Sequence, residues 1–307
     1  MLRCNGLKLT YLSTLFGVVQ LTWGSFMRNM QWGQKGRVKV LQALLLAGAA
    51  MLLGACATTQ PEVTKAAATG PEETKAVLWV GNSFFYYNNS MHGHVGQLIR
   101  GSTVADKTGH RSVSATISGS GINWHDLESH FKPNGVGSYS FNAKNEVVFN
   151  TFTKPFDVVL MMDCSQCPIH PQLRSVFYEH AKKNSDIARK HGARPAFFMS
   201  WAYDDAREMT EQLATEYTNA GRANNALVVP AGLAFARSLK DRPDIALTIA
   251  DKRHPTLAGT YLAACTVLAS LYKSNPEGNT YTAGLDAATA KFLQTVAWQT
   301  VQDYQKR

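Results

Sequence analysis

The chain has 307 residues, with 31 lysine and arginine residues against 22 aspartate and glutamate residues, and a formal charge of +9. Six of the basic residues and no acidic residue fall in residues 1–56, so the remainder carries 25 basic against 22 acidic residues. Because the basicity belongs mainly to this first segment and not to a clustered basic face, it argues against nucleic-acid binding. The length fits one large domain or two small ones.

The first segment has the parts of a secretory signal. A basic region precedes an apolar core, residues 41–53, that is too short for a comfortable membrane span. Residues 53–56 read Leu-Gly-Ala-Cys and resemble a lipobox, the site at which bacterial lipoproteins are lipidated on the cysteine and cleaved before it. We therefore expect lipidation at Cys56, with an uncleaved anchor or a plain signal peptide as the alternatives. The basic region before the apolar core consists of Lys35, Arg37 and Lys39.

Residues 1–56 are thus predicted to be an N-terminal targeting region. Its true start is expected at Met27 or Met30, since the preceding stretch fits poorly before a signal of ordinary length; a second anchoring helix is the rival interpretation. Ala57 follows the cysteine, and in lipoproteins a residue other than aspartate there implies the outer membrane. We expect an exported protein, lipid-anchored in the bacterial cell envelope at the outer membrane and facing the periplasm.

Residues 57–74 are rich in Ala, Thr, Pro, Glu and Lys, which predicts a flexible tether before a folded domain at 75–305. The domain opens on an apolar run, 77–80, that leads into Gly81-Asn82-Ser83. A short apolar run bounded by a glycine turn predicts a buried, parallel strand. A helix is predicted at 89–100. Ser83 therefore falls at the carboxyl end of a strand, where a hydroxyl within reach of a base can act as a nucleophile.

Further strands and helices alternate along the domain. A strand at 113–117 leads into Gly119-Ser120-Gly121, and an excursion follows at 134–150. Alternation of strands and helices predicts a parallel sheet covered by helices on both faces, the α/β class. The remaining predicted strands are 158–162, 195–200 and 226–229, and the remaining predicted helices are 173–191, 206–220, 233–239, 256–272 and 286–304.

A candidate base lies late in the chain. Asp251-Lys252-Arg253-His254-Pro255 precedes the apolar helix predicted at 256–272, and proline is tolerated at a first helical position. The three-residue spacing lets the Asp251 carboxylate bind one imidazole nitrogen of His254, which fixes the tautomer. The other nitrogen is then free to take a proton from Ser83.

These residues carry a resemblance. The chain resembles the SGNH/GDSL hydrolases, in the branch that reads Gly-Asn-Ser at its first conserved block. The resemblance lies in Gly81-Asn82-Ser83-Phe84, in Gly119-Ser120-Gly121 and in the segment from Asp251 to His254. The resemblance implies a flavodoxin-like three-layer α/β/α sandwich with a parallel central sheet. It also implies a serine esterase or lipase that needs no cofactor and no metal, with Ser83, His254 and Asp251 as its triad.

The resemblance further implies an oxyanion hole. Its donors are the backbone N–H groups of Ser83 and of Gly121, with Gly119 as the alternative to the latter. The family's side-chain donor falls near Ser165, and Gln166 is a substitute, but the family's glycine is replaced by Asp163, whose charge would oppose an oxyanion if it faced the pocket. Asn82 is expected to brace the turn or the second oxyanion donor.

The roles of two cysteines and of three aromatic residues near the site can also be considered from the sequence. Export implies an oxidising compartment, so Cys164 and Cys167 are expected to form a disulfide beside the site. Zinc would need more ligands than this pair offers. Trp124, Trp201 and Tyr203 either line a substrate cleft or pack in the core.

The prediction for function is a serine hydrolase that cleaves carboxylic esters through a Ser-His-Asp triad and an acyl-enzyme. Its partners would be a small-molecule or glycan ester, with acetylated carbohydrate as one substrate class, and a membrane through the lipid anchor. The alternatives are a catalytically impaired envelope binding module of the same fold, or a lipase or thioesterase.

Overall fold

A computed structural model gives the fold of the protein and describes residues 73–102, 107–135 and 138–307. The chain divides into two units, Met1–Thr69 and Gly70–Arg307, and all of the described residues belong to the second. The predicted targeting region with Cys56 and nearly all of the predicted tether therefore lie outside the described residues. No helix within the described residues combines the length and the apolarity needed to cross a membrane.

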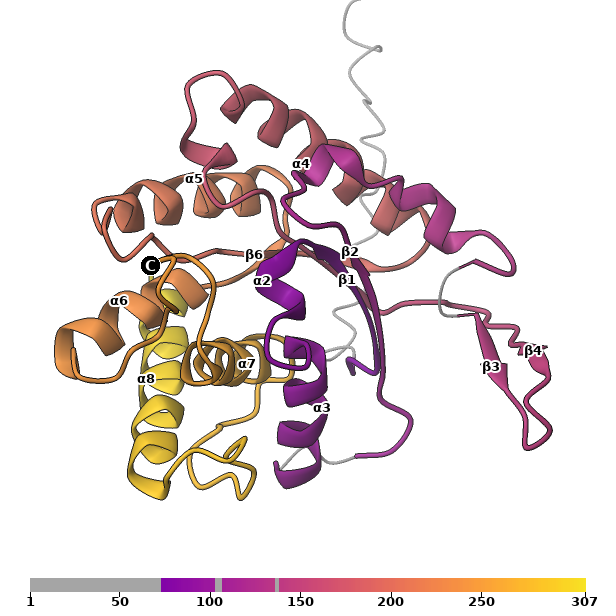
Figure 1. The fold of residues 1–307 in the computed structure, drawn as a ribbon. Helices are drawn as coiled ribbons and strands as arrows, with labels where there is room; N and C mark the ends of the chain where they lie inside the picture. The colour runs from indigo at the N-terminus through magenta and orange to yellow at the C-terminus, as the bar shows by residue number, and fades with distance from the viewer. Residues whose placement is uncertain (1–72, 103–106, 136–137) are drawn as a thin grey trace, which may run out of the picture. The chain divides into compact units, whose positions relative to one another are not determined.

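Five parallel strands form the central sheet, in the order β2-β1-β5-β6-β7 (Figure 1). In the middle of this sheet, Val80 of β1 lies between Ala115 of β2 and Met161 of β5. Four consecutive residues of β1, numbers 77–80, have no exposed surface, as expected for a strand covered on both faces. The strands are β1 (Ala76–Gly81), β2 (Arg111–Thr116), β5 (Val158–Met161), β6 (Arg194–Phe198) and β7 (Leu227–Val229).

The strand order reverses beside β1. The chain passes from β1 to β2 at one edge, then crosses to β5 on the other side of β1 and continues outward through β6 and β7. This is the flavodoxin-like order, in which ligands bind outside the carboxyl ends of the strands at the switch point. Since β1 ends at Gly81, Ser83 lies at that point of the sheet.

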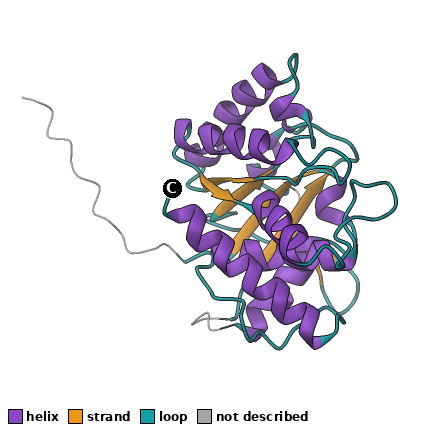
Figure 2. Cartoon of the chain, turned by 90° about the vertical axis from the view of Figure 1, so that its left-hand side faces the viewer, coloured by secondary structure: helices purple, strands orange, loops and turns teal. Residues whose placement is uncertain are grey.

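Helices cover both faces of the sheet (Figures 1 and 2). The helix α7 is buried along its whole length except at Leu257, and a helix that is apolar on all sides belongs in a core. The α/β class and the three-layer α/β/α sandwich with a parallel central sheet, predicted from the sequence, are confirmed. One layer consists of α4 (Arg174–Lys190) and α5 (Met209–Ala223), and the other of α3 (Met91–Gly101), α6 (Ala231–Asp241), α7 (Leu257–Leu271) and α8 (Ala287–Gln305).

The predicted strands and helices are found with shifted limits, and the helix predicted at 206–220 spans Met209–Ala223. The helix predicted at 89–100 begins only at Met91, because Asn89 and Ser90 have φ values of 63° and 67°, outside the helical region. The excursion predicted at 134–150 contains an antiparallel hairpin.

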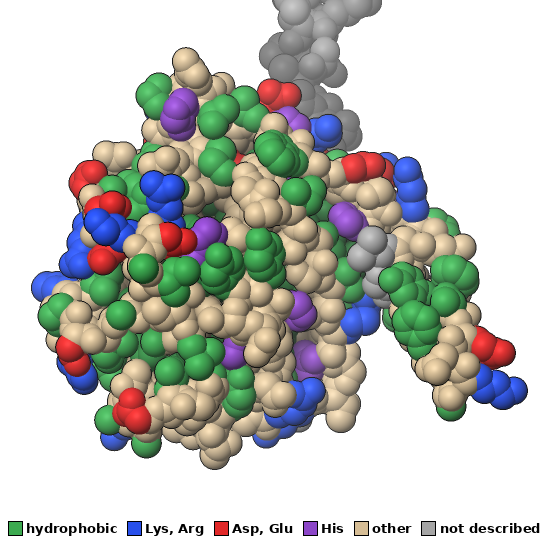
Figure 3. All heavy atoms as spheres, in the orientation of Figure 1, with side chains coloured by type: hydrophobic (Ala, Val, Ile, Leu, Met, Phe, Trp, Pro, Cys, Tyr) green, Lys and Arg blue, Asp and Glu red, His purple; other side chains and the backbone are tan. Residues whose placement is uncertain are grey.

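That hairpin consists of β3 (Tyr139–Phe141) and β4 (Val147–Phe149), and all six strand residues are exposed. Figure 3 shows its hydrophobic side chains gathered on the projecting arm of the molecule. The register pairs Tyr139 with Phe149 and Phe141 with Val147. These four apolar side chains therefore share one face of the hairpin.

Candidate active site

Ser83 is the first residue of a short helix, α2 (Ser83–Tyr86), directly beyond β1. The side chain of Asn82 caps this helix, because its Oδ1 accepts a hydrogen bond from the backbone N–H of Phe84 at 3.2 Å. A Cβ at Gly81 would lie 2.8 Å from the ring of Phe85, so only glycine fits the turn. The turn places Ser83 at the strand end with 6% of its surface exposed.

The loop before α7 holds the candidate base and its orienting carboxylate. The Nδ1–H of His254 donates to Oδ2 of Asp251 at 2.6 Å. The other oxygen of Asp251 accepts the backbone N–H groups of Arg253 and His254 at 2.9 and 3.0 Å, which curls the loop around the carboxylate. Partial desolvation raises the pKa of Asp251, but the hydrogen bonds from His254 and the two backbone groups outweigh it and leave the pKa below its ordinary value.

The fold brings this loop to Ser83. The hydroxyl of Ser83 donates to Nε2 of His254 at 2.8 Å, across 171 residues of sequence. This donor direction follows from the contact on the other side of the ring, since Nδ1 must carry the proton that it gives to Asp251. Ser83, His254 and Asp251 thus form a continuous hydrogen-bonded chain at the topological switch point. Such a chain can take up the hydroxyl proton while the serine oxygen attacks an electrophile.

The indole of Trp201 supports the loop from the core. Its Nε1–H donates to the backbone carbonyl of Arg253 at 2.9 Å, and its ring stacks on Phe84 at 4.5 Å between centroids. Trp201 is completely buried and Tyr203 is 9% exposed, whereas Trp124 is 60% exposed. Of the three aromatic residues considered as cleft lining, Trp201 belongs to the core and Trp124 faces solvent.

The loop after β2 lies against the end of β1. The hydroxyl of Ser120 donates to the carbonyl of Gly81 at 3.0 Å, and Nδ2 of Asn82 donates to the carbonyl of Ser120 at 3.1 Å. Gly119 has a φ of 70°, which glycine adopts without steric cost. A Cβ at Gly121 would lie 2.7 Å from Oδ1 of Asn123 and 3.0 Å from Oδ1 of Asp163, so a larger residue here would displace these two side chains.

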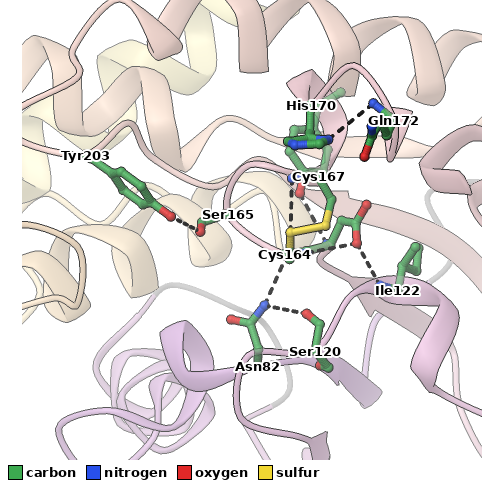
Figure 4. The surroundings of a disulfide bond; sticks show 11 residues. Asn82, Ser120, Ile122, Cys164, Ser165, Cys167, His170, Gln172 and Tyr203 are labelled. Carbon is green, nitrogen blue, oxygen red and sulfur yellow. Dashed lines mark hydrogen bonds between the residues drawn. A yellow bond between two sulfur atoms is a disulfide. The ribbon is translucent and has the colours of Figure 1, made fainter. Parts of the chain in front are cut away.

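Asp163 joins this loop to the end of β5. Its Oδ1 accepts the backbone N–H groups of Ile122 and Cys164, both at 2.8 Å, and its backbone carbonyl accepts Nδ2 of Asn82 at 3.2 Å (Figure 4). Burial raises the pKa of this carboxyl to about 6, against the opposing effect of the two hydrogen bonds. The carboxylate therefore ties the Gly121 loop in place, a structural role that the sequence did not indicate.

The segment after Asp163 contains the expected disulfide. Cys164 and Cys167 are bonded, and Asp163 with these two sulfur atoms is a group of possible metal ligands within 4.8 Å. A disulfide offers no thiolate, so the bonded pair does not suit a metal. Inside the loop, the hydroxyl of Ser165 shares a 2.5 Å hydrogen bond with that of Tyr203 (Figure 4), whereas Nε2 of Gln166 is directed at Sδ of Met209 at 4.0 Å.

Three further residues at the site were missed by the sequence reasoning. The ring of Tyr87 stacks on the imidazole of His254, with centroids 4.3 Å apart and planes at 11°. Asn88 donates to the carbonyl of Pro255 beside His254, and Oδ1 of Asn123 lies 2.7 Å from where a Cβ at Gly121 would stand. Tyr87 lies four residues after Ser83, so the helical spacing of one turn is a signal that could have found it.

No family model and no curated protein matches the chain. Among solved structures, it is similar to a DUF4886 family protein from Bacteroides uniformis, with a TM-score of 0.52 and 18% identity over 75% of this chain and 95% of that chain. It is also similar to a catalytic mutant of an acetylxylan esterase from Geobacillus stearothermophilus, with a TM-score of 0.46 and 14% identity over 65% and 94% of the two chains. A psychrotrophic esterase from Pseudoalteromonas sp. has a TM-score of 0.44 and 12% identity over 65% and 98%. At these identities, the likeness to the Bacteroides uniformis protein concerns the fold alone.

Proposed function

We propose that the protein is a serine hydrolase of the SGNH type that cleaves carboxylic esters. The observation that carries the proposal is the continuous contact from Asp251 through His254 to Ser83, with hydrogen bonds of 2.6 and 2.8 Å. Hydrogen-bond reach between a nucleophile and a base, with the base oriented by a third group, is the geometric signature of an activated serine.

In the proposed reaction, the Ser83 oxygen attacks the ester carbonyl carbon while its proton passes to Nε2 of His254. The tetrahedral intermediate then collapses, the bond to the alcohol oxygen breaks, and His254 returns the proton to the leaving alcohol. Water, deprotonated by His254, then attacks the acyl carbon. The bond to the Ser83 oxygen breaks, that oxygen takes the proton back from His254, and the acid is released. Asp251 stays ionised throughout and stabilises the imidazolium.

The proposed oxyanion donors are the backbone N–H groups of Ser83 and Gly121 and the hydroxyl of Ser165. If the hydroxyl of Tyr203 is the donor in their 2.5 Å contact, the proton of Ser165 is available to the oxyanion. Asp163 does not oppose this arrangement as a free charge, because two backbone N–H groups bind its Oδ1. Gly119 and Asn82 would support the hole indirectly, by fixing the loop that presents the N–H of Gly121.

Acetylated carbohydrate is the substrate class included in the proposal. The exposed indole of Trp124 supports it, since Trp124 lies three residues after Gly121 and offers an apolar face on which a sugar ring can stack. Export and a lipid anchor at Cys56 complete the proposal and would place the site in the cell envelope.

Labelling with a fluorophosphonate, together with hydrolysis of p-nitrophenyl acetate, tests the proposal. The wild-type protein should be labelled at Ser83 and should hydrolyse the ester, and Ser83→Ala should do neither. A wild-type protein with no labelling and no hydrolysis of any short acyl ester would favour a binding module of the same fold. Preference for long over short acyl chains would favour a lipase or thioesterase.

A further inference from the structure

The turn that follows α2 binds the loop that carries the proposed base. Nδ2 of Asn88 donates to the backbone carbonyl of Pro255 at 2.9 Å and to the hydroxyl of Thr260 at 2.8 Å. Pro255 directly follows His254, and Thr260 lies in the first turn of α7. Both N–H bonds of one amide are therefore used to hold the segment on the carboxyl side of His254. The contact spans 167 residues of sequence to Pro255, so it is a product of the fold and not of local structure.

The backbone around Asn88 is strained. Asn88, Asn89 and Ser90 have φ values of 52°, 63° and 67°, three consecutive residues in the left-handed region. Residues other than glycine visit this region singly and at a steric cost, so a run of three persists only where its surroundings determine it. Such strain concentrates at functional sites, and here it falls five residues after Ser83.

A buried histidine holds the strained turn in place. Nε2 of His94 donates to the carbonyl of Asn88 at 2.7 Å, and Nδ1 accepts from the hydroxyl of Tyr281 at 2.7 Å. The tautomer follows from these partners, since a carbonyl only accepts. His94 is 7% exposed. The backbone of Asn88 is thus held by His94 of α3, which is itself held by Tyr281 in the segment before α8.

The same segment also packs on the imidazole itself. Tyr87 stacks on the ring of His254 at 4.3 Å, and Phe84 meets it edge-on at 5.6 Å. Phe84 and Tyr87, which follow Ser83 closely in the sequence, therefore pack against the ring of His254. Displacement of Pro255 would move His254 relative to Ser83, because the two residues share a peptide bond.

We propose that Asn88 is a positioning residue that sets the distance between the Ser83 hydroxyl and Nε2 of His254. This inference rests on the proposed hydrolase function. Proton transfer needs the two atoms within hydrogen-bond reach, and a misplacement of about 1 Å can cost on the order of a hundredfold in rate. Asn88 touches neither reacting atom and acts through the position of the His254 loop.

Steady-state hydrolysis of p-nitrophenyl acetate by Asn88→Gly and Asn89→Gly tests the proposal. Both variants place glycine at a positive φ, so the relief of backbone strain is matched. Asn89 is exposed and makes no side-chain hydrogen bond to any described residue, which makes it the control. We expect kcat of Asn88→Gly to fall by roughly ten- to a hundredfold with KM nearly unchanged, and kcat of Asn89→Gly to stay within about twofold of the wild type.

Rates are expressed per active site, counted by end-point fluorophosphonate labelling, so that a loss of folded protein does not mimic a loss of kcat. Asn88→Asp is the second variant, since it keeps the side-chain shape and the tolerance of positive φ but cannot donate to Pro255. It should lose kcat as Asn88→Gly does. Values of kcat for both Asn88 variants within about twofold of Asn89→Gly would overturn the positioning role.

The two failures are distinguishable. Wild-type activity in Ser83→Ala would refute the hydrolase mechanism itself. An inactive Ser83→Ala together with fully active Asn88 variants would refute only the role of Asn88.

Discussion

The carboxylate of Asp163 accepts the backbone N–H of Ile122 at 2.8 Å and thereby joins the end of β5 to the loop that carries Gly121. The contact places an ionisable group with 2% exposure next to the proposed oxyanion hole. Its backbone partners suit either a carboxylate or an amide oxygen. The charge of Asp163 is therefore not required for the fold and acts against it when the group ionises.

Asp163 should make stability fall as the pH rises. Burial raises its pKa from 3.8 to about 6, so the folded state binds the proton more tightly than the unfolded state. Its contribution to stability is fully present below about pH 4 and is lost as the pH rises through 6. The free energy of unfolding of Asp163→Asn, minus that of the wild type, should therefore be larger at pH 7 than at pH 4, by on the order of 2 kcal/mol.

Urea unfolding of both proteins at the two pH values measures this difference. Asparagine can still accept from Ile122 and Cys164, so the variant should fold. An equal free-energy difference at pH 4 and pH 7 would show that Asp163 does not titrate as the buried environment requires.

The second prediction concerns Gly121. A Cβ there would lie 2.7 Å from Oδ1 of Asn123 and 3.0 Å from Oδ1 of Asp163, so these side chains must give way, and Asp163 is the group that holds the loop. We expect Gly121→Ala to reduce kcat for ester hydrolysis by up to about a hundredfold, the cost of losing one oxyanion donor, because displacement of the Asp163 carboxylate re-aims the N–H of residue 121. Gly93→Ala is the control, because a Cβ at Gly93 meets no atom within 4 Å. Because alanine keeps the backbone N–H, equal kcat values in the two variants would show that the added methyl group does not displace this donor, and the prediction would fail.

The sequence predicted the sheet and the proposed triad because both have local signals. The run from Val77 to Val80 is apolar at every position and ends at a glycine, which is the pattern of a short strand buried on both faces. The spacing of Asp251 and His254 placed both in one loop, where their contact depends on few intervening residues. At Asn89 the predicted helix began too early because the left-handed backbone of Asn89 and Ser90 delays its start to Met91.

The residues that hold the site together could not be predicted from the sequence. The partners of Asn88 and Asp163 lie 167 and 41 residues away, and no periodicity relates the members of either pair. The substitution of Asp163 for a glycine suggested a charge in the pocket. Only the packed loop shows that backbone N–H groups bind its Oδ1.

The third prediction concerns the side-chain oxyanion donor. Ser165 and Gln166 lie in the same disulfide loop, but Ser165 contacts Tyr203 whereas Gln166 is directed at Met209. We expect Ser165→Ala to lose about a hundredfold in kcat and Gln166→Ala to stay within a few-fold of the wild type. The opposite result would transfer the donor role to Gln166, and full activity in both would leave the backbone groups as the donors.

The fourth prediction concerns Cys56 and depends on the sequence alone. If residues 53–56 are a lipobox, the wild-type protein should incorporate labelled palmitate and fractionate with membranes. Cys56→Ser should abolish the incorporation and move the protein to the soluble periplasm. The serine variant keeps the preceding signal, which separates lipidation from export. Absence of palmitate from the wild-type protein would contradict the lipoprotein prediction.

The last prediction concerns the proposed triad. Ser83→Ala and His254→Ala should each reduce ester hydrolysis severely, because each removes one end of the 2.8 Å proton-transfer contact. Residues that act as one unit are non-additive, so the double variant should be little slower than either single variant. Asp251→Asn should cost less than either, since a poorly oriented histidine can still accept a proton. If the rate losses of the two single variants multiplied in the double variant, Ser83 and His254 would act independently. The hydrogen bond between them would then not contribute to catalysis.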